Sequence, residues 1–321
     1  MTEPQKTRVV FWGSPRIAAE FLTALTQHEK LSVIACVTQP EKILQRQGKT
    51  LTRSTVHERA AALEIPVFTP KLIKKEADEL LHALNQIGFD IFVVLAYGKI
   101  LPQSIIDAPR LKAVNFHGSL LPLLRGASPI EHALLYGFKQ TGWTLQRIVS
   151  QLDAGSIIAQ SQVAIAEDET TQTLYAKMTA DLLEHGIAML MNYIEGRADI
   201  RAQDESQATH CGKILAEDGR LIFTESAHAL RNRYRAFTPR PGVFAFFRGK
   251  KIKLTFNLTT PPKAMASAPG SLLQTGKTEL WLVCADGHAL LLESVTPEGK
   301  KTISAADFIN GYRVTTGDIF N

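Results

Sequence analysis

Five short apolar runs, separated by stretches with helical spacing, limit the possible folds of the first 150 residues more than any other feature. They cover residues 8–13, 31–37, 65–68, 90–96 and 113–117. The run DIFVVLA at 90–96 is apolar after its first residue, as in a central parallel strand covered on both faces. Between the first two runs, Ile17, Phe21 and Leu25 recur at helical spacing. This alternation predicts an α/β fold with a doubly wound, mostly parallel, Rossmann-like sheet.

A change of pattern near residue 200 divides the chain. Leu174, Met178 and Leu182 lie four residues apart and predict a long helix over 171–195, after which a polar stretch is typical of a linker. Ser226 then caps a helix over 226–235, and closely spaced short strands with turn residues predict a small OB-like β-barrel. We predict a Rossmann-like catalytic domain, a linker and a C-terminal OB-like domain, at residues 1–197, 198–208 and 209–321.

The charge is concentrated in the C-terminal part of the chain. The 321 residues carry a net charge of +5, but residues 1–205 sum to −1 and residues 206–321 to +6. A neutral part joined to a basic part suggests contact with a polyanion, although the excess charge also serves solubility. The basic residues of the C-terminal part include Arg231, Arg233, Arg235, Arg240, Lys250, Lys251 and Lys253.

Several classes of protein are disfavoured by missing motifs. The first strand-to-helix turn, Gly13-Ser14-Pro15, lacks GxGxxG, and there is no GxxxxGK[ST], so neither a dinucleotide nor a P-loop site is predicted. The three cysteines, Cys36, Cys211 and Cys284, have no zinc or disulfide spacing and are expected to be buried. The N-terminal apolar run is too short for a signal peptide and no run could span a membrane. We expect a cytoplasmic monomer without a metal.

Polar residues that suit carbonyl chemistry stand at the ends of two strands. Asn115 and His117 lie two apart on a strand, so their side chains point to the same face. An amide donor beside a titratable imidazole suits a carbonyl that becomes an oxyanion. Asp153 lies in a turn just after another apolar strand. Taken alone, a strand-end Asn-x-His is more often a structural hydrogen-bonding pair than a catalytic one.

The stretch that holds Asn115 and His117 resembles the signature of the formyltransferases that use 10-formyltetrahydrofolate. It reads Asn115-Phe-His-Gly-Ser-Leu-Leu-Pro122, followed by Arg125-Gly126-Ala127, and Asp153 stands where that family has its catalytic aspartate. Similar segments occur over most of the chain: Thr38-Gln39-Pro40, Ala96-Tyr97-Gly98, Ile100-Leu101-Pro102 and Arg235-Ala236-Phe237-Thr238-Pro239. The C-terminal part is similar to the members of this family that act on tRNA.

The resemblance implies that the formyl group of 10-formyltetrahydrofolate passes to the α-amine of initiator methionyl-tRNA. It implies a catalytic set of Asn115, His117 and Asp153, with no metal. The implied folate-site residues are Ser119, Leu120, Leu121, Pro122, Tyr97 and Gly98. The implied tRNA contacts are Lys42, Arg46, Lys49 and Arg53 in a basic loop, and Arg231, Arg233 and Lys251 in the C-terminal domain.

Three other functions fit part of this pattern. A formyltransferase acting on a nucleotide-sugar amine would share the first domain and a small second domain. A 10-formyltetrahydrofolate hydrolase would use water in place of the amine. A non-enzymatic RNA-binding protein would use only the barrel, since such domains bind nucleic acid. The basic loop and basic C-terminal part favour tRNA, and the complete Asn, His and Asp set favours an enzyme.

Overall fold

The computed structural model describes residues 5–44 and 50–321, which form two compact units. Unit 1 contains residues 1–127, 141–163 and 177–211, and unit 2 contains residues 128–140, 164–176 and 212–321. Each unit is therefore assembled from three separate stretches of the chain.

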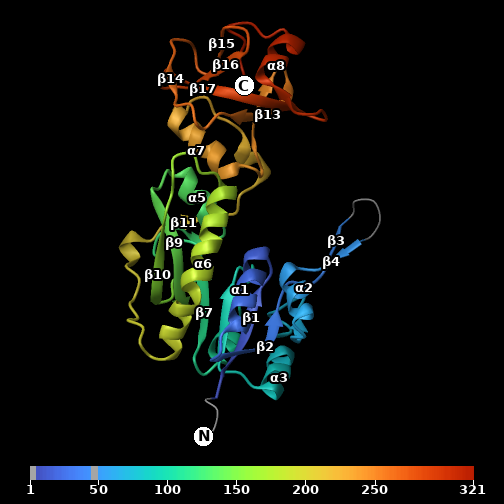
Figure 1. Ribbon diagram of the computed structural model, residues 1–321, viewed down its shortest axis with the longest axis vertical. Coiled ribbons are helices and arrows are strands. Elements are labelled where there is room, and N and C mark those ends of the chain that lie inside the picture. The colour runs from blue at the N-terminus through green and yellow to red at the C-terminus, as the bar shows by residue number, and fades with distance from the viewer. Residues whose placement is uncertain (1–4, 45–49) are drawn as a thin grey trace. The chain divides into compact units, whose positions relative to one another are not determined.

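Unit 1 is built around a seven-stranded sheet (Figure 1). Its strands are β1 (Thr7–Gly13), β2 (Leu31–Val37), β5 (Val67–Phe68), β6 (Ile91–Leu95), β7 (Ala113–His117), β9 (Gln140–Arg147) and β10 (Ile157–Ala164). Their order is β10-β9-β7-β6-β1-β2-β5, so the chain winds outward from β1 in both directions. Neighbours from β5 to β7 pair in parallel, and β7 pairs with β9 in antiparallel register. The predicted doubly wound, mostly parallel sheet is confirmed.

Burial explains why these runs become strands. Every residue of β6 is buried, and the apolar face of α1 (Arg16–Gln27) packs Phe21 and Leu25 into the core. The aromatic rings of Trp12, Phe92 and Tyr97 meet in a cluster on the sheet. The other helices around this sheet are α2 (Thr55–Ala62), α3 (Ala77–Ile87), α4 (Gln103–Asp107) and α6 (Thr171–Ile194). Strands β3 (Lys42–Leu44) and β4 (Thr50–Thr52) pair with each other as a separate hairpin.

Unit 2 contains an antiparallel sheet of order β12-β13-β17-β16-β15. Its strands are β12 (Val243–Phe247), β13 (Lys250–Phe256), β14 (Lys263–Ala264), β15 (Leu272–Thr275), β16 (Glu279–Val283), β17 (His288–Pro297) and β18 (Ile303–Ser304). The last residues of the chain close it, because Phe320 bridges Phe247 of β12 and Ile319 bridges Ser271 beside β15. The predicted small C-terminal barrel is confirmed, with the C-terminus as the closing element.

Arg235 joins two of the three stretches of unit 2, since it lies within residues 212–321 and bonds to residues 164–176. It lies on α7 (Ala227–Phe237), which begins at the Ser226 cap, and it is only 5% exposed. Its guanidinium donates to the carbonyl oxygens of Glu169 and Ala166 at 2.8 and 2.7 Å, and to Asn232 at 2.9 Å. The remaining helices of this unit are α5 (Pro129–Leu135), α8 (Ala305–Tyr312) and the short η2 (Ala216–Gly219). Arg235 is thus a structural residue rather than part of a basic surface.

The segment predicted as a linker, residues 198–208, packs on unit 1. Arg201 forms a two-way backbone bridge with Ile157, and the segment continues through η1 (Glu205–Gln207) into β11 (His210–Cys211). Strand β11 then pairs in parallel with β8 (Arg125–Gly126). The boundary between the two compact units therefore does not fall at residues 198–208, because polar side chains of this segment bond to unit 1.

The buried Arg235 allows a direct test of this packing. We expect Arg235→Met to lower the free energy of unfolding by about 2–5 kcal/mol, because it removes the buried guanidinium that donates to the carbonyls of Glu169 and Ala166 and to the side chain of Asn232. Urea-induced unfolding measures the change, with the exposed Arg240→Met as the matched control. Equal midpoints for the two variants would contradict the structural role.

Candidate active site

Asn115 and His117 lie on β7 at the carboxyl edge of the unit 1 sheet. They occupy alternate positions of the strand and so share one face. His117 is 6% exposed and Asn115 is half-buried. Among the described residues, the Asn115 side-chain amide has no hydrogen-bond partner, so its donor is available to a ligand.

The two nitrogens of His117 have different surroundings. Nε2 lies 2.8 Å from the carbonyl oxygen of Leu124, and since a carbonyl only accepts, Nε2 carries the proton of this bond. Nδ1 lies 3.5 Å from Oδ2 of Asp153. The imidazole therefore presents Nδ1 to the carboxylate of Asp153.

Asp153 is held by hydrogen bonds to both oxygens of its carboxylate. Oδ2 accepts from the backbone N–H of Gly126 at 2.9 Å, and Oδ1 accepts from Nε2 of Gln146 at 2.9 Å. Asp153 itself has a φ of 51°, in the left-handed region, and is 11% exposed. Two loops distant in sequence, 118–127 and 151–155, are thus joined at the carboxylate that faces His117.

Glycines allow the close approach of these loops. Gly126 has a φ of 122°, and a Cβ there would stand 2.1 Å from the carbonyl oxygen of Cys211. A Cβ on Gly155 would stand 1.7 Å from the carbonyl oxygen of Arg147. Both positions exclude any larger residue unless the backbone moves.

The predicted folate segment Ser119, Leu120, Leu121 and Pro122 is adjacent to this site, and its polar groups already have partners in the protein. Ser119 donates its hydroxyl to the carbonyl of Leu123 at 2.6 Å, and Leu121 N–H donates to Thr144 at 3.0 Å. Gln160 donates to the carbonyl of Leu121 at 2.9 Å, and Thr209 N–H donates to the carbonyl of Pro122 at 3.3 Å. Leu120 is half-buried, and its side chain remains partly available for contact.

Tyr97 and Gly98 differ in their exposure, since the tyrosine side chain is buried and the glycine is exposed. The Tyr97 ring is 1% exposed and lies edge-on against Trp12 at 5.3 Å, and burial raises the pKa of its hydroxyl. Ala96 and Gly98 are exposed, both at positive φ, and Gln39 donates to the carbonyl of Tyr97 at 2.8 Å. This turn therefore offers its backbone to a ligand, and the tyrosine side chain belongs to the core.

The predicted tRNA contacts mostly lie outside the described residues or are engaged within unit 2. Arg46, Lys49 and the Lys42 side chain are outside the described part of the chain, and the exposed Arg53 pairs with Glu41 at 2.8 Å. Arg231 donates to the carbonyl of Leu258, Arg233 pairs with Glu225 at 2.7 Å and is 17% exposed, and Lys251 lies over the Phe244 ring at 3.6 Å. These three C-terminal residues stabilise their own unit, which lessens their value as phosphate ligands.

Sequence reasoning missed the residues that surround the predicted catalytic set. Strands β7 and β9 pair so that Gln146 lies opposite Asn115, and Thr144 opposite His117. Both Thr144 and Gln146 are buried and share the face of the predicted residues. The alternating pattern before Asp153 indicates that Thr144 and Gln146 share one face of their strand. Only the register between β7 and β9 shows that this face is the one that carries Asn115 and His117.

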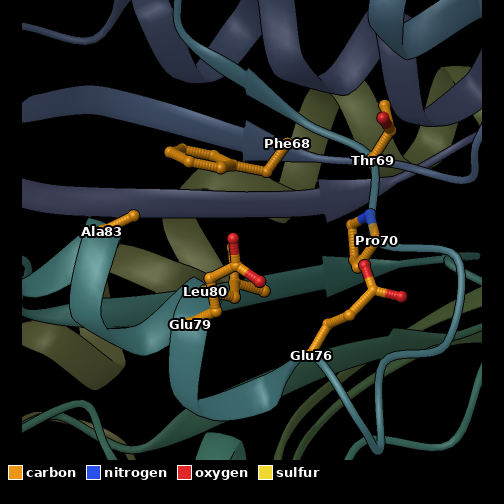
Figure 2. A pocket seen from close by; sticks show the side chains of 7 residues that line it. All are labelled: Phe68, Thr69, Pro70, Glu76, Glu79, Leu80 and Ala83. Carbon is orange, nitrogen blue, oxygen red and sulfur yellow. The ribbon is translucent and has the colours of Figure 1, made fainter.

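A pocket of about 240 Å³ lies elsewhere in unit 1, between β5 and α3 (Figure 2). It is lined by Phe68, Thr69, Pro70, Glu76, Glu79, Leu80 and Ala83. Its two carboxylates make it unfavourable for an anionic folate or for RNA, and it contains no predicted site residue.

Among the residues described, no group of His, Cys, Asp or Glu could hold a metal ion, and no helix is long and apolar enough to cross a membrane.

The fold and the site together define a formyltransferase. Residues 6–189 match the family model described as formyl transferase, and residues 213–313 match that of the formyl transferase C-terminal domain. The chain therefore belongs to the formyl transferase family.

Its relatives narrow the family further. The chain is 37% identical over 312 residues to the methionyl-tRNA formyltransferase of Myxococcus xanthus (strain DK1622), covering 97% of each chain. It is 35% identical over 317 residues to the methionyl-tRNA formyltransferase of Leptospira interrogans serogroup Icterohaemorrhagiae serovar copenhageni (strain Fiocruz L1-130), covering 98% of this chain and 99% of that one.

Solved structures share the fold at low identity. The sugar 3N-formyl transferase WlaRD aligns with a TM-score of 0.65 at 16% identity, covering 92% of this chain and 100% of that one. HypX from Aquifex aeolicus in complex with tetrahydrofolic acid aligns with a TM-score of 0.59 at 16% identity, covering 99% of this chain and 51% of that one.

Gly126 provides a test of how the site is assembled. We expect Gly126→Ala to lower the free energy of unfolding by about 1–3 kcal/mol from its backbone conformation alone, with a further loss from the clash with Cys211. Urea-induced unfolding measures this loss. Gly212→Ala is the control, since nothing lies within 4 Å of its Cβ position. Similar stabilities would show that the loop tolerates a side chain at residue 126.

Proposed function

We propose that this protein transfers the formyl group of 10-formyltetrahydrofolate to the α-amine of methionine on initiator methionyl-tRNA. The juxtaposition of Asn115, His117 and Asp153 at the carboxyl edge of the sheet is the observation that carries the proposal. Near-full-length similarity to methionyl-tRNA formyltransferases supports tRNA rather than a sugar nucleotide as acceptor. The protein would act as a cytoplasmic monomer.

The site supplies what the reaction requires. The α-amine of an aminoacyl ester has a pKa below the usual value of about 7.7–8.0, so a neutral amine is available to attack the formyl carbon. The C–N bond that forms creates a tetrahedral oxyanion, and the free Asn115 amide would donate to it. The amine then loses a proton, which the Nδ1 atom of His117, facing the carboxylate of Asp153, would accept. The intermediate collapses by releasing tetrahydrofolate, whose nitrogen takes up a proton.

His117 can also donate to the oxyanion if its Nε2–H exchanges partners. In this structure Nε2–H is bonded to the carbonyl of Leu124. Donation to a formyl oxygen would require that bond to lengthen or break when substrate enters. The folate would lie beside loop 118–122 and the exposed backbone of Ala96 and Gly98.

We also propose that tRNA contacts the basic end of unit 2, which we define as the exposed residues Arg248, Lys250, Lys300, Lys301 and Arg313. Lys300 lies 3.5 Å from the hydroxyl of Tyr312, and Arg248 donates to the carbonyl of Tyr312 at 3.0 Å, so these residues converge. Phosphate contacts from such a surface contribute affinity and salt dependence rather than sequence specificity.

The reaction is tested by His117→Ala. Under single-turnover conditions, with 10-formyltetrahydrofolate and charged initiator tRNA both saturating, we expect formyl transfer to slow about 10²–10³-fold. The exposed His82→Ala on α3 is the control and should match wild type. Parallel reactions with a sugar-nucleotide amine, or with no acceptor, distinguish the other formyltransferase and the hydrolase. Transfer by His117→Ala within threefold of wild type would remove His117 from the chemical step.

The basic end is tested by a matched pair of charge reversals. Lys300 and Lys301 follow the end of β17, whereas Lys263 pairs with Ala289 near its start. We expect Lys300→Glu with Lys301→Glu to weaken tRNA binding and to lower the salt slope by about 0.7–0.9 for each phosphate that the protein no longer neutralises. Lys263→Glu with Lys277→Glu changes the net charge equally and should have less effect. Equal effects would mean that only total charge matters.

A further inference from the structure

The segment 201–211 supplies side chains to the two loops that carry the catalytic set. Arg201 donates to Gln160, which donates in turn to the carbonyl of Leu121. Thr209 accepts from the N–H of Leu124, whose carbonyl bonds to His117. Between them lies Gln203, which contacts the loop of Asp153 directly.

The orientation of the Gln203 amide is determined by its neighbours. Its Oε1 accepts from Nε and Nη2 of Arg125 at 3.0 and 2.8 Å, and a guanidinium only donates. Its Nε2 donates to the carbonyl oxygens of Asp153 and Gly155, both at 2.7 Å. The amide therefore cannot rotate by 180° without setting donor against donor and acceptor against acceptor.

Arg125 has its own fixed position. It is 1% exposed, and Glu205 binds it through both carboxylate oxygens at 2.7 and 2.9 Å. Bidentate pairing of this kind holds a guanidinium in one plane. Arg125 is thus a rigid donor for Gln203, and its neighbour Gly126 donates to the carboxylate of Asp153.

A second amide continues the chain to the carboxylate. Oε1 of Gln146 faces Nε2 of Gln203 at 3.5 Å, which leaves Nε2 of Gln146 to donate to Oδ1 of Asp153 at 2.9 Å. Gln146 is 2% exposed and lies opposite Asn115 in the sheet. The order of contacts is therefore Arg125, Gln203, Gln146, Asp153 and His117.

We propose that Gln203 is a positioning residue for the transfer reaction: it holds the left-handed turn at Asp153, and through Gln146 the carboxylate itself, in register with His117. The inference rests on the proposed function. Because misplacement of a reacting group by about 1 Å can cost about 10²-fold in rate, the effect is expected in the chemical step rather than in substrate binding.

The test uses Gln203→Glu in the full chain. A glutamate has the same length and still accepts from Arg125, but it cannot donate to the two carbonyls of the turn. We expect kcat to fall about 10- to 100-fold, with the KM for both substrates within twofold of wild type. Gln207→Glu is the matched control: the same substitution in the same segment, at an exposed side chain that donates to Asp204.

A double-mutant cycle separates positioning from a general structural effect. In an Asp153→Ala background the carboxylate is gone, so Gln203→Glu should cost less than threefold in single-turnover rate. An equal loss in both backgrounds, or wild-type kcat for Gln203→Glu, would overturn the proposal. An inactive wild-type protein in the same assay would instead refute the proposed function.

Gln146→Met keeps the proposal testable should Gln203→Glu fail to fold. It removes the donor to Oδ1 of Asp153 without adding charge and leaves Arg125 and segment 201–211 bonded. We expect a fall in kcat of the same order, again with little change in KM. Thermal unfolding of both variants establishes which is folded, and wild-type kcat in a folded Gln146→Met would exclude transmission through this amide.

Discussion

The hydrogen bond from Gly126 N–H to the Asp153 carboxylate is the contact on which the rest of the site depends. It directly joins the loop after β7 to the loop after β9, and Gln203 links the same two loops through Arg125 and the carbonyl of Asp153. His117 completes the junction, since one ring nitrogen bonds to the first loop and the other faces the carboxylate of the second. A change in either loop therefore changes the surroundings of the imidazole.

The environment of Asp153 also explains the polar composition near residue 200. A carboxylate at 11% exposure requires donors, and its left-handed turn requires a partner for the carbonyl oxygens around it. Gln146 and Gln203 supply both sets of donors, while Arg125 fixes the direction of the second amide. The side chains that make residues 198–208 polar are in part hydrogen-bond partners of the site, with Gln203 donating to the carbonyl of Asp153.

Unit 2 uses its basic residues for two different purposes. Arg233 and Arg235 form internal pairs and backbone bonds, and they hold α7 and its neighbours in place. The lysines and arginines at the turns after β12 and β17 are exposed, and among them Arg248 also pairs with Asp318 at 3.0 Å. The net charge calculated from the sequence does not distinguish internally bonded basic residues from exposed ones, because each contributes one positive charge.

Local pattern determined much of this protein. The apolar runs predicted β1, β2, β5, β6 and β7, and the spacing of Asn115 and His117 placed them on one face of β7. What the tertiary structure decided is pairing at long range: that Asp153 reaches His117, that Gln146 lies opposite Asn115, and that segment 201–211 bonds to the catalytic loops rather than serving as a linker. The physical reason is that the periodicity of apolar residues indicates on which face of its own helix or strand a side chain lies. The hydrogen-bond partners of that side chain depend on the register between strands and on loop geometry.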